Sequence, residues 1–192
     1  MQSNTRKLEA MKKIFIVLVT GSIFFASCKN NGQSTKKDND NKKDTTGRAS
    51  VNDIMAGYLD LKNALANDNS HEASIHARAI SGALEKFDKK TLSPQQISIY
   101  NDLEDDIKEN AEHISTSEID HQREHFQILS EDMYQLLNAT GTNQTLYIDF
   151  CPMYDKGNGA IWISEIKEIK NPYMGSKMPS CGSIKKEISK EK

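Results

Sequence analysis

The sequence predicts a mainly α-helical fold, an antiparallel four-helix bundle followed by a small C-terminal β-hairpin and loop element. Apolar residues recur at steps of three and four through four segments between residues 51 and 138. The connections between these segments are short, which favours antiparallel neighbours. Beyond Gly141 the pattern changes to two strand-like runs separated by a turn. Together these features predict one domain over residues 51–188.

Each helical segment combines an apolar stripe with a start or stop signal. We expect Ser70 to cap the second helix, Ser93-Pro94-Gln95-Gln96 to begin the third, and the fourth to run from about Glu118 to Asn138 before Gly141. The stripes comprise Ile54, Tyr58, Leu61 and Leu65; Ala73, Ala77, Ile80, Leu84 and Phe87; Tyr100, Leu103, Ile107, Ala111 and Ile114; and Ile119, Phe126, Leu129, Met133 and Leu136.

The C-terminal part reads as a hairpin. Residues 146–150 and 160–164 are strand-like, and Asp155-Lys156-Gly157-Asn158-Gly159 forms the turn between them. Asn171-Pro172-Tyr173-Met174-Gly175 predicts a second turn. From Lys185 the chain is charged, and we expect a frayed tail, with residues 189–192 outside the domain.

The N-terminus indicates export. Met11-Lys12-Lys13 precedes an apolar run of 13 residues, Ile14 to Ala26, which is too short to span a bilayer. The run ends in Phe25-Ala26-Ser27-Cys28 and resembles a bacterial lipoprotein signal, with residues 1–10 as an extension ahead of the true start. The alternative is a buried first helix. We therefore expect residues 1–27 to be removed and Cys28 to carry a lipid anchor, facing the periplasm or cell surface.

Composition narrows the function further. Residues 28–50 have no aliphatic side chain larger than Ala49, so we expect a disordered tether. Residues 1–27 hold four basic residues and one acidic residue, so the net charge of −2 becomes −5 once they are removed. This balance offers no basic face for nucleic acid.

The chain also lacks the common catalytic motifs. It contains no Ser/His/Asp arrangement, no phosphate-binding glycine loop and no His-Glu-x-x-His motif, and we expect no enzymatic activity.

Sulfur residues gather between Cys151 and Gly182, a segment with two of the three cysteines and three of the seven methionines. In an extended chain Cys151 and Met153 project to one side, and Met174, Met178 and Cys181 could close over the same point. Soft sulfur ligands favour Cu(I), and cysteine with histidine also suits zinc. Cys151 and Cys181 could equally form a disulfide, with the methionines filling core gaps. Residue types alone leave both interpretations open.

Histidines supply a second candidate ligand set. His121 and His125 are four residues apart, so both imidazoles emerge from one face of the predicted fourth helix. His113 lies near the end of the preceding helix and could approach them. We expect His71 and His76, on the second helix, to be surface residues.

Several motifs, in order, resemble an exported domain of unknown function that occurs alone or fused to periplasmic adaptor subunits of copper/silver-type efflux systems. They are His121-Gln122-Arg123-Glu124-His125-Phe126, Phe150-Cys151-Pro152-Met153, Gly159-Ala160-Ile161-Trp162-Ile163-Ser164, Lys167-Glu168-Ile169-Lys170-Asn171-Pro172-Tyr173-Met174-Gly175 and Met178-Pro179-Ser180-Cys181-Gly182.

The resemblance implies a role in periplasmic heavy-metal handling. The expected metal ligands are His121, His125, Cys151, Met153, Met178 and Cys181, with Met174 as a further candidate. The expected ion is Cu(I) or another soft metal, with zinc as the alternative, and the protein would buffer it or deliver it to an efflux adaptor or another periplasmic metal protein. The rival hypothesis is a non-catalytic interaction module stapled by a Cys151–Cys181 disulfide.

Overall fold

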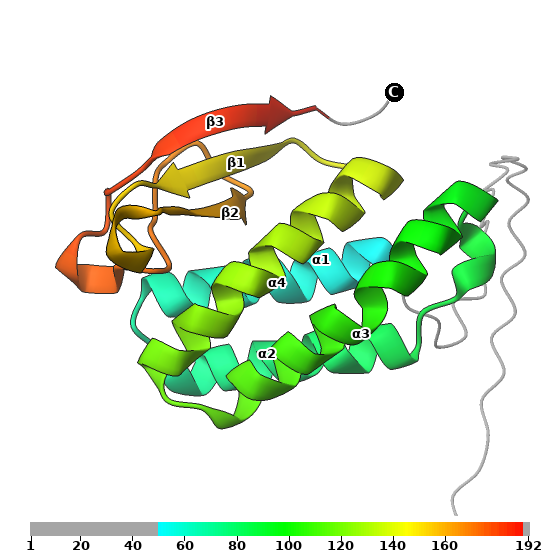
Figure 1. Cartoon of the computed structure of the whole chain (residues 1–192), viewed down its shortest axis with the longest axis horizontal. Coiled ribbons are helices and arrows are strands. Elements are labelled where there is room, and N and C mark those ends of the chain that lie inside the picture. Colours follow the sequence, from blue (N-terminus) through cyan, green and yellow to red (C-terminus); the bar gives the residue numbers. More distant parts are fainter. Residues whose placement is uncertain (1–49, 190–192) are drawn as a thin grey trace, which may run out of the picture. The chain divides into compact units, whose positions relative to one another are not determined.

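The computed structural model describes residues 50–189 of the chain, which form a mainly helical unit with a small antiparallel sheet at its C-terminal end (Figure 1). The predicted signal segment, Cys28, the tether up to residue 49 and residues 190–192 lie outside the described residues. The helices are α1 (Val51–Ala66), α2 (Ser70–Glu85), α3 (Pro94–Thr116) and α4 (Ile119–Thr140), and the strands are β1 (Leu146–Cys151), β2 (Ala160–Ser164) and β3 (Ser183–Ile188).

Helices that follow one another in the chain pack against one another: α1 on α2, α2 on α3, and α3 on α4. The predicted apolar stripes face this packing, and their members are buried except Phe87 and Ile119, which are partly buried against the same core. Removing this apolar surface from water is the main stabilising contribution to the helical layer. None of the described helices is long and apolar enough to cross a membrane.

Helix ends follow local hydrogen bonding. Ser93 and Gln96 form the predicted reciprocal box at the start of α3: Ser93 N–H donates to Gln96 Oε1 (2.9 Å). The prediction that Ser70 caps α2 is wrong by one residue, because Asn69 Oδ1 accepts from the Glu72 N–H and Ser70 is already helical. Gly141 ends α4 with a φ of +74°, as its type predicts.

The sheet has the order β2-β1-β3, so the predicted hairpin is confirmed and a third strand is added. In the hairpin Phe150 pairs with Ile161 and Cys151 with Ala160. The expectation of a frayed tail from Lys185 is wrong for residues up to Ile188, which pair with the other edge of β1. All but the last β3 residue are exposed, so charged side chains point into water while the backbone pairs. That explains why a charge-rich stretch forms a strand.

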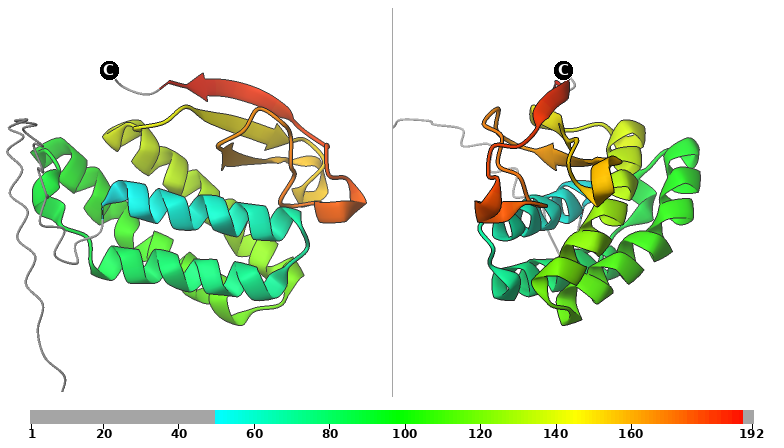
Figure 2. Two further views of the ribbon diagram at one scale, coloured as in Figure 1. Left: turned by 180° about the vertical axis from the view of Figure 1, so that it is seen from behind. Right: turned by 60° about the vertical axis from the view of Figure 1, so that its left-hand side comes forward.

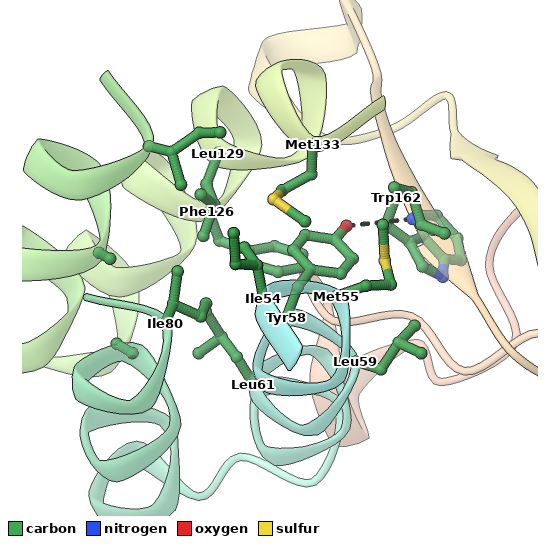
Figure 3. Packing of buried hydrophobic residues seen from close by; sticks show 14 of the residues in the cluster. Ile54, Met55, Tyr58, Leu59, Leu61, Ile80, Phe126, Leu129, Met133 and Trp162 are labelled. Atoms are coloured by element: carbon green, nitrogen blue, oxygen red, sulfur yellow. Dashed lines mark hydrogen bonds between the residues drawn. The ribbon is translucent and has the colours of Figure 1, made fainter. Parts of the chain in front are cut away.

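The sheet rests on the helices through β2, which contacts α4 and α1 (Figures 1 and 2). Tyr58 of α1 lies in the core beside Phe126, and its hydroxyl accepts from the Ile163 N–H at 3.0 Å (Figure 3). The Tyr173 hydroxyl donates to the Ile161 carbonyl from the loop after β2. Two tyrosines therefore satisfy backbone groups on the outer edge of β2, an edge that would otherwise be open to pairing.

The loop between β2 and β3 is anchored on α4 by Arg123. The guanidinium donates to the Pro172 carbonyl (2.8 Å) and to the Leu65 carbonyl (2.9 Å), and it pairs with Asp68. The Asp68 carboxylate also accepts from the Ser176 N–H, and these bonds lower the pKa of Asp68 to about 2. One buried cation thus joins the helical layer to the C-terminal loop.

Candidate metal centre

Three histidines converge where α3 turns into α4. His113 lies in the last turn of α3, and His121 and His125 lie one turn apart near the start of α4. Only Ser117 and Glu118 separate the two helices, so the antiparallel turn brings the three rings together. One nitrogen from each ring lies within 4.8 Å of the others. Among the described residues this is the single group of three or more histidine, cysteine and carboxylate ligands that meets this criterion.

Two of the rings are spaced as two ligands of one metal ion would be. His121 Nε2 and His125 Nε2 are 3.2 Å apart. Two nitrogens bound at 2.0–2.1 Å to one tetrahedral ion lie about 3.3 Å apart, so this separation fits a shared ion. The His113 ring lies parallel to that of His125, with ring centroids 4.3 Å apart.

Neighbouring acceptors select the tautomers of these two rings. Asn110 Oδ1 lies 2.9 Å from His125 Nδ1, and Glu124 Oε2 lies 2.6 Å from His121 Nδ1. Each acceptor holds a proton on Nδ1, which leaves the Nε2 lone pair free to bind a cation. Asn110 is in turn oriented by its own amide, which donates to the Asp106 carbonyl at 2.8 Å. The arrangement matches the outer-shell hydrogen bonds that accompany histidine ligands.

Electrostatics also favour the neutral form of the most buried ring. Partial burial, followed by the proximity of His113 and His121, lowers the pKa of His125. A neutral imidazole is the form that coordinates a metal. Glu109 and Glu124 lie beside the cluster and contact His113 and His121. Their charges favour a cation at this position.

Hydrogen bonds of Gln122 and Arg123 anchor the first turns of α4 to the rest of the fold. Gln122, fully buried, donates from its amide nitrogen to the Ser70 carbonyl, the Ser74 hydroxyl and the Ile114 carbonyl at 3.0–3.1 Å. Arg123 fixes the adjacent side of the helix to the C-terminal loop. With Gln122 and Arg123 anchored on other faces, His121 and His125 are left on the face toward α3.

The two cysteines of the expected set do not join the histidine cluster. Cys151 is buried at the end of β1, and its sulfur is 3.6 Å from that of the partly buried Cys181. Met153 is 55% exposed, while Met174 and Met178 are partly buried. Figure 1 shows the α3–α4 turn on the side of the helices away from the sheet that carries Cys151. The histidines and the two cysteines of the expected set therefore lie in separate clusters.

His113 is the member of the cluster that the expected ligand set omitted. Its position near the end of one helix, eight residues before His121, was the available signal. That signal becomes decisive only when the length of the turn is known, because one more or one fewer residue would rotate His113 away from the partner helix.

Comparisons with known proteins give this chain a similarity to one protein family, and that family has no assigned function. A search of curated proteins and a search of solved structures each returned no match. A family model described as "Protein of unknown function (DUF3347)" matches residues 54–145. The match spans the helices and all three clustered histidines, and it ends just before β1. Residues 54–145 of this chain are therefore similar to a domain family whose function is unknown.

Proposed function

We propose that this protein is an exported transition-metal-binding protein that holds its ion through His113, His121 and His125. The observation that carries the proposal is the convergence of three imidazoles, two of them with Nε2 atoms 3.2 Å apart. Three nitrogen donors suit Zn²⁺ and Cu²⁺. We favour these ions over Cu(I), because the two cysteine thiols that would favour Cu(I) lie beside each other and outside the histidine cluster.

The exposure of the cluster supports an exchangeable ion. The side chains of His113 and His121 are 48% and 52% exposed. Three protein ligands leave a fourth position for water or for a donor atom of another protein. Such a site releases its ion more readily than a closed four-ligand site. This favours buffering or delivery, and the partner suggested by the family resemblance is an efflux adaptor or another periplasmic metal protein.

The same proposal places the protein at a membrane through Cys28. It rests on the basic Met11-Lys12-Lys13 segment, the apolar run after it and the small residues before Cys28. Mass spectrometry of the N-terminus of the cell-derived protein tests this part. A lipid-modified Cys28 is expected, and an intact N-terminus that begins at Met1 or Met11 would contradict it.

Calorimetric titration of the full chain with Zn²⁺ and with Cu²⁺ tests the ligand set. We expect one ion per chain, and we expect His121→Ala and His125→Ala each to weaken binding on the order of 100-fold. His71→Ala, at an exposed position on α2, is the matched control and should leave affinity unchanged. Equal affinity for wild type and both cluster variants would refute the histidine site.

A Cys151→Ser/Cys181→Ser double variant separates this proposal from the sulfur-containing site expected from the sequence. Retained affinity in that variant supports the histidine group, and lost affinity with retained folding supports the sulfur ligands. Asn110→Ala tests the outer-shell bond to His125 and should weaken binding by about 10-fold to 100-fold. Asn110→Asp keeps the acceptor for His125 but lacks the amide that donates to the Asp106 carbonyl, so it should recover part of the affinity lost in Asn110→Ala, which a merely structural role for Asn110 would not predict.

The second candidate, a non-catalytic interaction module stapled by a disulfide, is favoured by the 3.6 Å approach of the Cys151 and Cys181 sulfurs. It does not exclude metal binding, because the two groups occupy different parts of the fold.

A further inference from the structure

Cys151 and Cys181 are brought together by the register of the sheet. Phe150 pairs with Ser183 in the β1–β3 ladder, so the next residues in each direction, Cys151 and Gly182, face one another just beyond it. Cys181 immediately precedes Gly182 in the chain. Its sulfur reaches that of Cys151 at 3.6 Å.

The close approach depends on Gly182. Its φ is +147°, and a Cβ there would lie 2.8 Å from the Trp162 ring and 3.0 Å from the Phe150 carbonyl oxygen. Only glycine lets the chain pass this near to β1 and the tryptophan. A bulkier residue would push Cys181 away from Cys151.

Hydrogen bonds within the loop also hold Cys181 in place. Its carbonyl accepts from the side-chain amide of Asn171 (2.5 Å), which is fully buried, and its N–H donates to the Met178 carbonyl (3.1 Å). Asn171 Oδ1 accepts from the N–H groups of Tyr173 and Met174, and its own N–H donates to the Pro179 carbonyl. The second thiol is therefore positioned before any bond forms, so little chain entropy remains to be lost.

We propose that Cys151 and Cys181 form a redox-active pair that a low-molecular-weight or protein disulfide oxidises to an intramolecular disulfide. The Cys181 thiolate attacks one sulfur of the incoming disulfide and expels the first thiol. The Cys151 thiolate then attacks the Cys181 sulfur and expels the second. Two cysteine thiols and one disulfide thus become one protein disulfide and two free thiols, with two electrons passing to the oxidant.

Exposure sets the order of these steps. Cys151 is fully buried, whereas Cys181 is partly exposed, so the incoming disulfide meets Cys181 first. Desolvation and the adjacent Cys151 thiol raise the pKa of Cys181. The reaction is accordingly slow in neutral solution and faster in alkaline solution, because the thiolate is the attacking species.

The strand that the disulfide would affect most directly is β3. Five of its six residues are exposed, so apolar burial contributes little to holding this strand on β1. A covalent link two residues before β3 begins limits how far the strand can separate from β1. Oxidation would therefore order β3 and the loop before it, and leave the α3–α4 turn unaffected.

The test uses the full chain in detergent solution with Cys28→Ser, which removes the third thiol and leaves the pair intact. After equilibration with oxidised and reduced glutathione, we expect a mass decrease of about 2 Da and a proteolytic fragment that joins Cys151 to Cys181. We also expect the melting temperature to rise on the order of 10 °C. Amide exchange of residues 183–188 should slow by roughly tenfold, with no change at residues 113–125.

Single variants test the order of attack. Cys151→Ser should accumulate a glutathione adduct on Cys181, whereas Cys181→Ser should react far more slowly at the buried Cys151. Glutathione on both cysteines without a cross-link would overturn the proposal, as would free thiols at every glutathione ratio. A metal ion retained by the two thiols and protecting them from oxidation would overturn it in favour of a thiolate metal site.

Discussion

The pH dependence of stability provides a sharp prediction, because a carboxylic acid lies inside the sheet without a partner. Asp149 of β1 is fully buried, and neither of its carboxyl oxygens has a hydrogen-bond partner among the described residues. Burial raises its pKa from 3.8 to about 6, although the nearby Lys62 charge acts in the opposite direction. The folded state therefore prefers the neutral acid.

The direction and size of the change in the free energy of unfolding follow from the difference between the folded-state and unfolded-state pKa of Asp149. A raised folded-state pKa means that the folded protein binds the proton more tightly, so the Asp149 contribution is fully present below pH 3.8 and is lost as pH rises through about 6. Two pKa units correspond to about 3 kcal/mol. With these two pKa values, about 1 kcal/mol of that loss has occurred by about pH 4.5, and about 2 kcal/mol more follows by about pH 7.5.

Replacing Asp149 by Asn removes the titration. Relative to that of wild type, the free energy of unfolding of Asp149→Asn should increase by about 2 kcal/mol between about pH 4.5 and 7.5, because only wild type loses stability as Asp149 ionises. Urea unfolding can be followed through Trp162, the sole tryptophan, which is fully buried and directly opposite Asp149 in the sheet. Asp102→Asn, at an exposed site on α3, is the control for losing one charge. A difference between Asp149→Asn and wild type that stays constant across this pH range would refute the reasoning.

Two further predictions concern the loop that covers the sheet. Arg123→Met should lower the free energy of unfolding by about 3 kcal/mol in urea titrations, because it leaves Asp68 and two carbonyl groups without their buried donor; a loss below about 1 kcal/mol would contradict the anchoring role. Tyr173→Phe should cost about 1–2 kcal/mol, since the Ile161 carbonyl loses its hydroxyl donor. Tyr134→Phe is the size-matched control, and equal losses in the two variants would argue against a specific bond at Tyr173.

The helices were predictable because each carries its own local signals. The apolar stripes of α1 and α3 consist of the residues found in the core, and the box at Ser93 and Gln96 forms as expected. Such features depend on side chains three or four positions apart, which a sequence displays directly. β3 was missed for the opposite reason: Lys185, Lys186 and Glu187 face solvent, and its pairing depends on β1, more than thirty residues earlier.

The candidate site was predictable only in part. The spacing of His121 and His125 places them on one helical face, and the structure brings their Nε2 atoms within 3.2 Å. The addition of His113 depends on how α3 and α4 are turned toward each other. Asn110, which positions His125, carries no metal-ligand signal of its own. A site that combines histidine with sulfur ligands remains a prediction from residue type; among the described residues the two cysteines lie beside each other and outside the histidine cluster.

By itself, the sequence determined the helical class, the hairpin, the stripe residues of the core and the candidate ligands, because periodicity and residue chemistry are local properties of a chain. Only the tertiary structure decided which ligands meet. The α3–α4 turn joins His113 to His121 and His125, and the register of β1 with β3 joins Cys151 to Cys181. Both pairings depend on the rotation of a helix or the register of a strand, and one residue of shift in either would separate the groups.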